Sequence, residues 1–93
     1  MIKSFKCKET DKIYWGKSSR KLPSDIHRHA KIKLDMLEAA LEKLDLKSPP
    51  SNHLEELKGD YAGFISIRIN KQFRLVFRFD HGNAYDVHIT DYH

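Results

Sequence analysis

Three arginines alternate with apolar residues in the second half of the chain, and their spacing suggests a phosphate site. Arg68, Arg74 and Arg78 lie within two segments in which isoleucine, leucine or phenylalanine recurs at every second position. Side chains two apart on a strand share a face, so we expect the three guanidinium groups on the polar face of a sheet. Guanidinium groups bind phosphate through paired hydrogen bonds. The alternative is cross-strand pairing with three aspartates, Asp80, Asp86 and Asp91.

The last three residues could supply acid–base chemistry. The sequence ends in Asp91, Tyr92 and His93. Imidazole titrates near neutrality and a nearby carboxylate favours its charged form, so His93 is a candidate general acid or base. Tyr92 could stack on a base or hydrogen-bond to a phosphate.

The first third of the chain is strongly basic. Residues 1–33 hold ten lysines and arginines against three acidic residues, whereas the whole chain has a net charge of +4. Tyr14 and Trp15 lie within this block. Such a block attracts phosphate backbones, although a solvated basic surface has the same composition.

Several classes of site and protein are disfavoured. His27 and His29 diverge on a helix, and His88 and His93 fall on opposite faces of a strand, so neither pair predicts a metal site. Cys7 is the one cysteine, which excludes an internal disulfide or a cysteine zinc site. No nucleophile motif, phosphate-binding glycine loop or dinucleotide fingerprint is present. With no signal segment and no long apolar run, we expect a cytoplasmic protein without metal, cofactor or membrane contact.

Helices are expected in the first half of the 93-residue chain. Residues 2–5 predict a short strand, and residues 10–15 a short helix that Thr10 caps and Gly16 ends. Ser24 can cap a long helix that continues to about residue 47, because one apolar stripe recurs at steps of three and four. The members of that stripe are Ile26, Ala30, Leu34, Leu37, Leu41 and Leu44.

The second half predicts an antiparallel meander. Residues 54–59 are interpreted as a single turn closed by Gly59, and the period changes to two from Phe64 onward. Strands over about 64–70, 73–79 and 85–90 are separated by a turn near Lys71 and a hairpin at 80–83. In the last strand, Tyr85, Val87 and Ile89 are expected to face the core. The chain is therefore expected to form one α+β domain over residues 1–93, with the long helix on one sheet face.

Several ordered segments, taken together, resemble the HigB family of the RelE/ParE toxin superfamily. They are the start at residues 1–6, the stretch 52–60 with its Leu-Lys-Gly turn, the segments 63–70 and 73–77, and the terminal Asp-Tyr-His. The resemblance covers essentially the whole chain. It implies the compact fold of that superfamily, with helices followed by an antiparallel sheet.

The resemblance also implies an activity: a metal-independent endoribonuclease that cuts mRNA in the ribosomal A site. The implied partners are the ribosome, mRNA and a helix-turn-helix antitoxin of the HigA type. The family's catalytic positions correspond to Lys58, Arg74, Asp91, Tyr92 and His93. His93 would transfer a proton, Lys58 and Arg74 would stabilise phosphate charge, Tyr92 would orient the substrate, and Asp91 would hold His93 or Arg74.

One departure and two alternatives follow. Some family members carry histidine three residues before the lysine, where this chain has Glu55; His53 lies two residues earlier, so the general base stays open. Arg68 is expected to contact substrate, and a basic cluster of Lys17, Arg20 and Lys21 to dock on ribosomal RNA. The alternatives are a ParE-like gyrase inhibitor and a non-enzymatic basic RNA-binding module.

Overall fold

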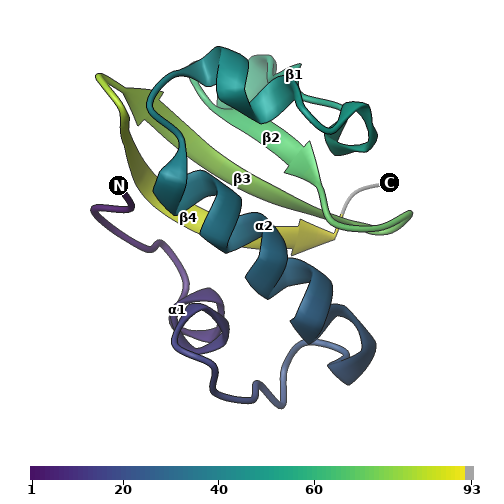
Figure 1. Ribbon diagram of the computed structural model, residues 1–93. Coiled ribbons are helices and arrows are strands. Elements are labelled where there is room, and N and C mark those ends of the chain that lie inside the picture. The colour runs from purple at the N-terminus through teal and green to yellow at the C-terminus, as the bar shows by residue number, and fades with distance from the viewer. Residues whose placement is uncertain (92–93) are drawn as a thin grey trace.

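A four-stranded antiparallel sheet forms the centre of the molecule (Figure 1). The computed structural model describes residues 1–91. The strands are β1 (Glu55–Glu56), β2 (Ile65–Arg68), β3 (Phe73–Asp80) and β4 (Asn83–Asp91), and they lie in sequence order. The expected α+β meander is confirmed. The expected single turn over 54–59 is wrong, because Glu55 and Glu56 pair with Ile65 and Ser66 as an edge strand.

One β-bulge changes which residues of β4 face the core. The pairing register shifts between Val76 and Arg78, opposite Asp86, whose φ is +54°. Ala84 and Val87, three apart, are therefore both buried. Tyr85 was expected on the core face, but it lies under the guanidinium of Arg78, 5.5 Å from ring centroid to Cζ. A bulge inserts one residue and reverses the alternation beyond it.

The N-terminal segment runs beside β4. The expected strand over 2–5 is instead two isolated parallel bridges, from Ile2 to Ala84 and from Phe5 to Val87. Helix α1 (Lys8–Tyr14) follows. Thr10 lies inside α1 rather than at its cap, and its buried hydroxyl accepts a hydrogen bond from the Ile89 amide at 3.0 Å. Gly16 ends the helix as expected, with a φ of +80° that suits glycine.

The expected long helix is divided into three parts. They are the 3-10 turn η1 (Ser24–Ile26), the helix α2 (His27–Ala39) and the 3-10 turn η2 (Lys43–Lys47). The Ser24 side chain makes no capping hydrogen bond. Ala40 is extended, with ψ at 132°. The carboxylate of Asp45 accepts hydrogen bonds from the backbone amides of Leu41 and Glu42. The chain therefore turns after residue 39.

This break removes two leucines from the core. Leu41 and Leu44 are 81% and 63% exposed, so their expected place in the apolar stripe is wrong. Leu46, on η2, is buried instead. The stripe holds only as far as α2 extends, where its buried residues are Ala30, Leu34 and Leu37.

Helix α2 crosses one face of the sheet, and α1 packs beside it against β4 (Figure 1). The sheet contributes its inward side chains to the shared core; the fully buried ones are Ile67, Leu75, Phe77, Ala84 and Val87. No helix within residues 1–91 has the length and apolarity that a membrane span requires. With one face covered by helices, the polar chemistry gathers on the opposite, outer face.

Candidate active site

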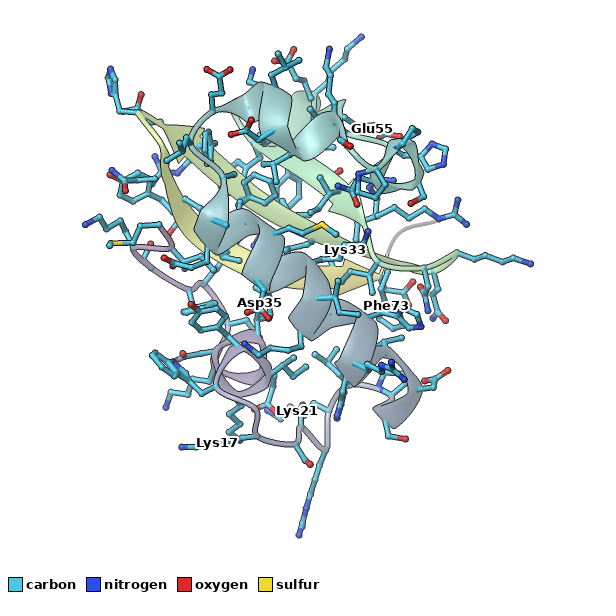
Figure 2. All side chains as sticks on the ribbon, viewed as in Figure 1. Lys17, Lys21, Lys33, Asp35, Glu55 and Phe73 are labelled. Atoms are coloured by element: carbon cyan, nitrogen blue, oxygen red, sulfur yellow. The ribbon has the colours of Figure 1, made fainter. Side chains whose placement is uncertain are left out.

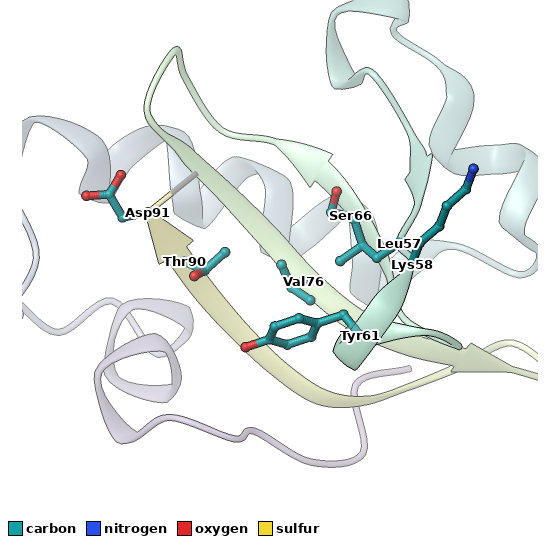
Figure 3. A pocket seen from close by; sticks show the side chains of 7 residues that line it. All are labelled: Leu57, Lys58, Tyr61, Ser66, Val76, Thr90 and Asp91. Atoms are coloured by element: carbon teal, nitrogen blue, oxygen red, sulfur yellow. The ribbon is translucent and has the colours of Figure 1, made fainter. Parts of the chain in front are cut away.

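A cavity of about 390 Å³ opens on the outer face of the sheet (Figure 3). Its floor comes from β2, β3 and β4, through Ser66, Val76 and Thr90. One wall comes from the segment after β1, which carries Lys58 into the 3-10 turn η4 (Gly59–Tyr61). Leu57, Tyr61 and Asp91 complete the lining. Lys58 and Asp91, both predicted as catalytic, are thus brought to one cavity, where Figure 3 shows them at opposite ends.

Lys58 is an exposed cation at the rim of this cavity. Within residues 1–91 its ammonium group makes no ion pair and no hydrogen bond. Its backbone is extended where it begins η4. An ammonium group in this position is hydrated and accessible, so it can approach a phosphate as a point charge.

Arg74 is the buried cation of the site, with only 5% of its surface exposed. Its Nε donates to the hydroxyl of Ser66 at 2.8 Å, and its Nη2 donates to the carbonyls of Ser66 at 3.3 Å and of His53. Nη1 lies 3.9 Å from the Glu55 carboxylate. The guanidinium is therefore held in one orientation beneath the outer face.

The segment that carries the His53 carbonyl is anchored by the buried asparagine that precedes it. Asn52 ends the 3-10 turn η3 (Pro50–Asn52) and is fully buried. Its Nδ2 donates to the carbonyls of Leu46 at 3.1 Å and Ser48 at 3.4 Å, and its Oδ1 accepts from Lys33 of α2. Burial lowers the pKa of Lys33 below its usual value. A chain of contacts thus runs from α2 to Arg74.

Arg74 lines a second cavity, of about 220 Å³. Its lining comprises His53, Glu55, Arg68, Asn70, Lys71 and Arg74. Arg68 lies opposite Arg74 in the register of β2 and β3, and its Nε donates to the carbonyl of Asn70 at 3.0 Å. Ser66 lines the first cavity and binds the cation of the second, so the two cavities share one boundary. Three cations and one carboxylate face this second cavity, which favours an anion.

Asp91 closes the described part of β4. Its β-sheet partner is Phe73, and its carboxylate accepts a hydrogen bond from the side-chain Nε2 of Gln72 at 3.1 Å. Tyr92 and His93 follow it and lie outside the described residues. Their predicted roles in orientation and proton transfer stay predictions.

The remaining predicted residues divide between the outer face and the opposite end of the molecule. Arg78 pairs with Asp86 at 2.9 Å, so for this arginine the cross-strand alternative is correct. Lys17, Arg20 and Lys21 are exposed on the segment between α1 and η1 and line none of the cavities described above. Figure 2 shows Lys17 and Lys21 near α1, far from Glu55.

Two residues of the site had only a weak signal in the sequence. Ser66 falls on the polar face by its period of two, but nothing local indicates that it holds Arg74, eight residues later. Tyr61 lies three residues after Lys58, and its ring enters the first cavity. Both depend on strand register, which brings distant residues together.

The comparisons with known proteins agree with this architecture. A family model described as the RelE-like toxin of the type II toxin–antitoxin system HigB matches residues 3–93. The chain belongs to the HigB-like toxin family. It is 39% identical over 90 residues to Toxin HigB-1 of Vibrio cholerae serotype O1, covering 96% of this chain and 95% of that protein. The predicted family is confirmed.

A second relative and a solved structure extend the comparison. The chain is 31% identical over 93 residues to Endoribonuclease HigB of Proteus vulgaris, and each protein is covered in full. Among solved structures, it resembles the YoeB–YefM complex from Staphylococcus aureus with a TM-score of 0.59 and 20% identity, covering all of this chain and 95% of that one. This likeness supports the RelE-like fold of the HigB-like chain.

Proposed function

We propose that this HigB-like toxin is a ribosome-dependent endoribonuclease that cuts mRNA in the A site. The observation that carries the proposal is the first cavity, which has Lys58 at its rim and, in its floor, Ser66, the residue that binds the buried cation Arg74. The Proteus vulgaris relative, an endoribonuclease by name, supports the class of reaction.

The proposed reaction is attack by a 2′-hydroxyl on its own 3′ phosphate. The O2′–phosphorus bond forms as the phosphorus–O5′ bond breaks, giving a 2′,3′-cyclic phosphate and a 5′-hydroxyl end. One proton leaves O2′ and another reaches O5′. Charge grows on the non-bridging oxygens, where fixed cations stabilise the transition state more than the ground state.

Each predicted residue has a role in this step. Lys58 binds a non-bridging oxygen directly, since its ammonium group is exposed. Arg74 acts from below through its charge, and Arg68 binds an adjoining phosphate from the second cavity. His93 transfers a proton, Tyr92 orients the nucleotide, and Asp91 holds His93 or Arg74 in place.

The second proton-transfer group is open between His53 and Glu55. Both line the second cavity. Glu55 has its carboxylate near Arg74. Replacing each by glutamine separates them: only the variant that lacks the base should lose its rate and the corresponding limb of the pH profile.

The partners follow from the family and from the charge distribution. As a type II toxin, the chain has an antitoxin partner; we propose a helix-turn-helix protein of the HigA type. We further propose that the protein acts in the cytoplasm and that Lys17, Arg20 and Lys21 contact ribosomal RNA. Reversing these three charges should weaken ribosome binding and its salt dependence, and unchanged binding would refute the contact.

Primer extension on a defined mRNA tests the activity. Wild-type protein should produce discrete cuts at in-frame codons only when ribosomes are present, and His93→Ala should abolish them. Cuts that persist in His93→Ala would remove His93 from the mechanism. The absence of any cut, with gyrase inhibited instead, would replace the nuclease by a ParE-like activity.

A further inference from the structure

The aromatic side chain of Tyr61 lines the first cavity. Neither the fold nor the proposed acid–base step explains why it is there. It is 40% exposed, although it is one of the larger apolar side chains in the molecule. Figure 3 shows its ring lying across the outer face of β3 and β4, between Lys58 and Thr90. An exposed ring inside a cavity that a lysine borders is an arrangement by which proteins hold unstacked bases.

The ring is held from beneath by two other aromatic groups. The His88 ring lies 6.2 Å from the Tyr61 ring between centroids, at an interplanar angle of 31°. Phe64 meets Tyr61 edge-on at 5.6 Å and 83°. Supported rings lose little freedom on binding, so stacking on them costs less entropy.

His88 is itself buried and incompletely hydrogen-bonded. It is 7% exposed, and its Nδ1 donates to the carbonyl of Asp86 at 2.9 Å. Its Nε2 is buried and has no hydrogen-bond partner within the described chain. A buried ring nitrogen without a partner is unusual. Its neighbours Tyr61 and Phe64 are aromatic, which indicates that the imidazole serves here as a packing surface for these two rings.

A third contact comes from the N-terminal segment. The Nζ of Lys6 lies 5.4 Å from the centroid of Tyr61, a cation–π contact. Lys6 is exposed and is fixed to β4 through its backbone amide, which donates to Val87. Because this ammonium group lies over the ring, a base that stacks on that face of Tyr61 displaces it, and the long lysine side chain can then reach the phosphate of the same nucleotide.

We infer that Tyr61 is a base-stacking platform for a single-stranded RNA nucleotide, with Lys6 as the phosphate contact of the same nucleotide. This inference rests on the proposed function, which supplies RNA as the ligand. It adds a base-binding position to the cavity that Lys58 borders. Tyr61 positions the substrate and is not a catalytic residue. Since every base has a π-face, the platform can bind any of the four bases, provided that the base is unstacked.

A binding experiment tests the platform separately from cleavage. The probe is a short single-stranded 2′-O-methyl RNA, which lacks the 2′-hydroxyl that the proposed reaction needs. Its affinity is measured by fluorescence anisotropy for the full chain and for Tyr61→Phe, Tyr61→Leu and Tyr61→Ala. We expect Tyr61→Phe to bind as the wild type, and Tyr61→Ala to bind roughly 5- to 150-fold more weakly. Tyr61→Leu controls for bulk and should resemble Tyr61→Ala.

Probes with one abasic position supply the decisive comparison. At one position, removing the base should weaken wild-type binding and leave Tyr61→Ala unchanged, because the two changes remove the same contact. Lys6→Gln should instead reduce the slope of log affinity against log salt by about 0.7, with the base-dependent loss intact.

The outcomes separate the inference from the proposed function. Equal affinities for wild type and Tyr61→Ala, no wild-type binding, or no coupling at any abasic position would overturn the platform. So would a Tyr61→Ala variant that loses only its affinity for antitoxin, since Tyr61 would then be a protein contact. Coupling at one position in a protein that cuts no mRNA would support the platform and overturn the nuclease.

Discussion

Replacing Ser66 by alanine tests whether Arg74 acts through its orientation. The hydroxyl of Ser66 accepts the hydrogen bond from Nε at 2.8 Å, and both residues are buried. Alanine removes that hydrogen bond, while Nη2 keeps its bonds to the carbonyls of Ser66 and His53. The guanidinium thus stays attached but can rotate about Nη2.

The expected effects have different sizes on stability and on rate. Removing a buried hydrogen bond to a charged group costs about 2 kcal/mol, which lowers the melting temperature of a domain this small by about 8–16 °C. A shift of about 1 Å in a charged group costs on the order of 100-fold in rate. Single-turnover cleavage on programmed ribosomes, below the melting temperature of the variant, measures the second effect.

A second buried serine provides the matched control. Ser19 is buried, and its hydroxyl donates to the carboxylate of Glu9 at 2.6 Å, a bond that lowers the pKa of Glu9. Ser19→Ala should lower stability and, once the toxin is bound to the ribosome, leave cleavage at the wild-type rate, because Ser19 borders neither cavity. Wild-type cleavage by Ser66→Ala, or equal losses in both variants, would refute the reasoning.

Three further predictions concern the scaffold. Asn52→Ala should lower the free energy of unfolding in urea by about 2 kcal/mol or more, because three buried or part-buried partners lose their hydrogen bonds; an unchanged value would show that Asn52 does not hold the loop. Burial lowers the pKa of His88 in the folded state, so the unfolded state takes up a proton first as pH falls below about 6.5. Stability should therefore be constant above that pH and decline below it, and His88→Phe should flatten the decline whereas His29→Gln, at an exposed position, should not. Leu37→Ala should cost about 2–5 kcal/mol, whereas exposed Leu44→Ala should stay within about 0.5 kcal/mol; similar costs would contradict the break after α2.

The sheet was largely predictable from the sequence, because alternation along a strand is a local property. The segments from Phe64 to Ile89 gave the meander and placed Arg68, Arg74 and Arg78 on its outer face. The bulge at Asp86 was not predictable, since its residue types also suit a regular strand. It reversed the place of Tyr85.

The end of the long helix was not predictable from the sequence. The apolar stripe continues past Ala39 in the sequence, yet the carboxylate of Asp45 binds the amides of Leu41 and Glu42 and stabilises a turn there. Helical periodicity alone does not reveal a competing cap.

The candidate site was predictable by residue type and not by environment. Family resemblance named Lys58 and Arg74, but the burial of one and the exposure of the other depend on contacts between distant segments. At His53, the group that binds Arg74 is the backbone carbonyl, which a residue of any type could supply. No side-chain pattern encodes it.

Single-turnover cleavage by Lys58→Gln is the most direct test of the outer-face cavity as the reaction centre. The Lys58 side chain makes no ion pair within residues 1–91, so its loss should leave the unfolding midpoint unchanged. Removing the cation that stabilises the charge on the phosphorane should slow cleavage on programmed ribosomes by about 10²- to 10³-fold, while Lys17→Gln at the opposite end of the molecule should cleave at the wild-type rate once bound. A wild-type rate for Lys58→Gln would contradict the assignment of the reaction to this cavity.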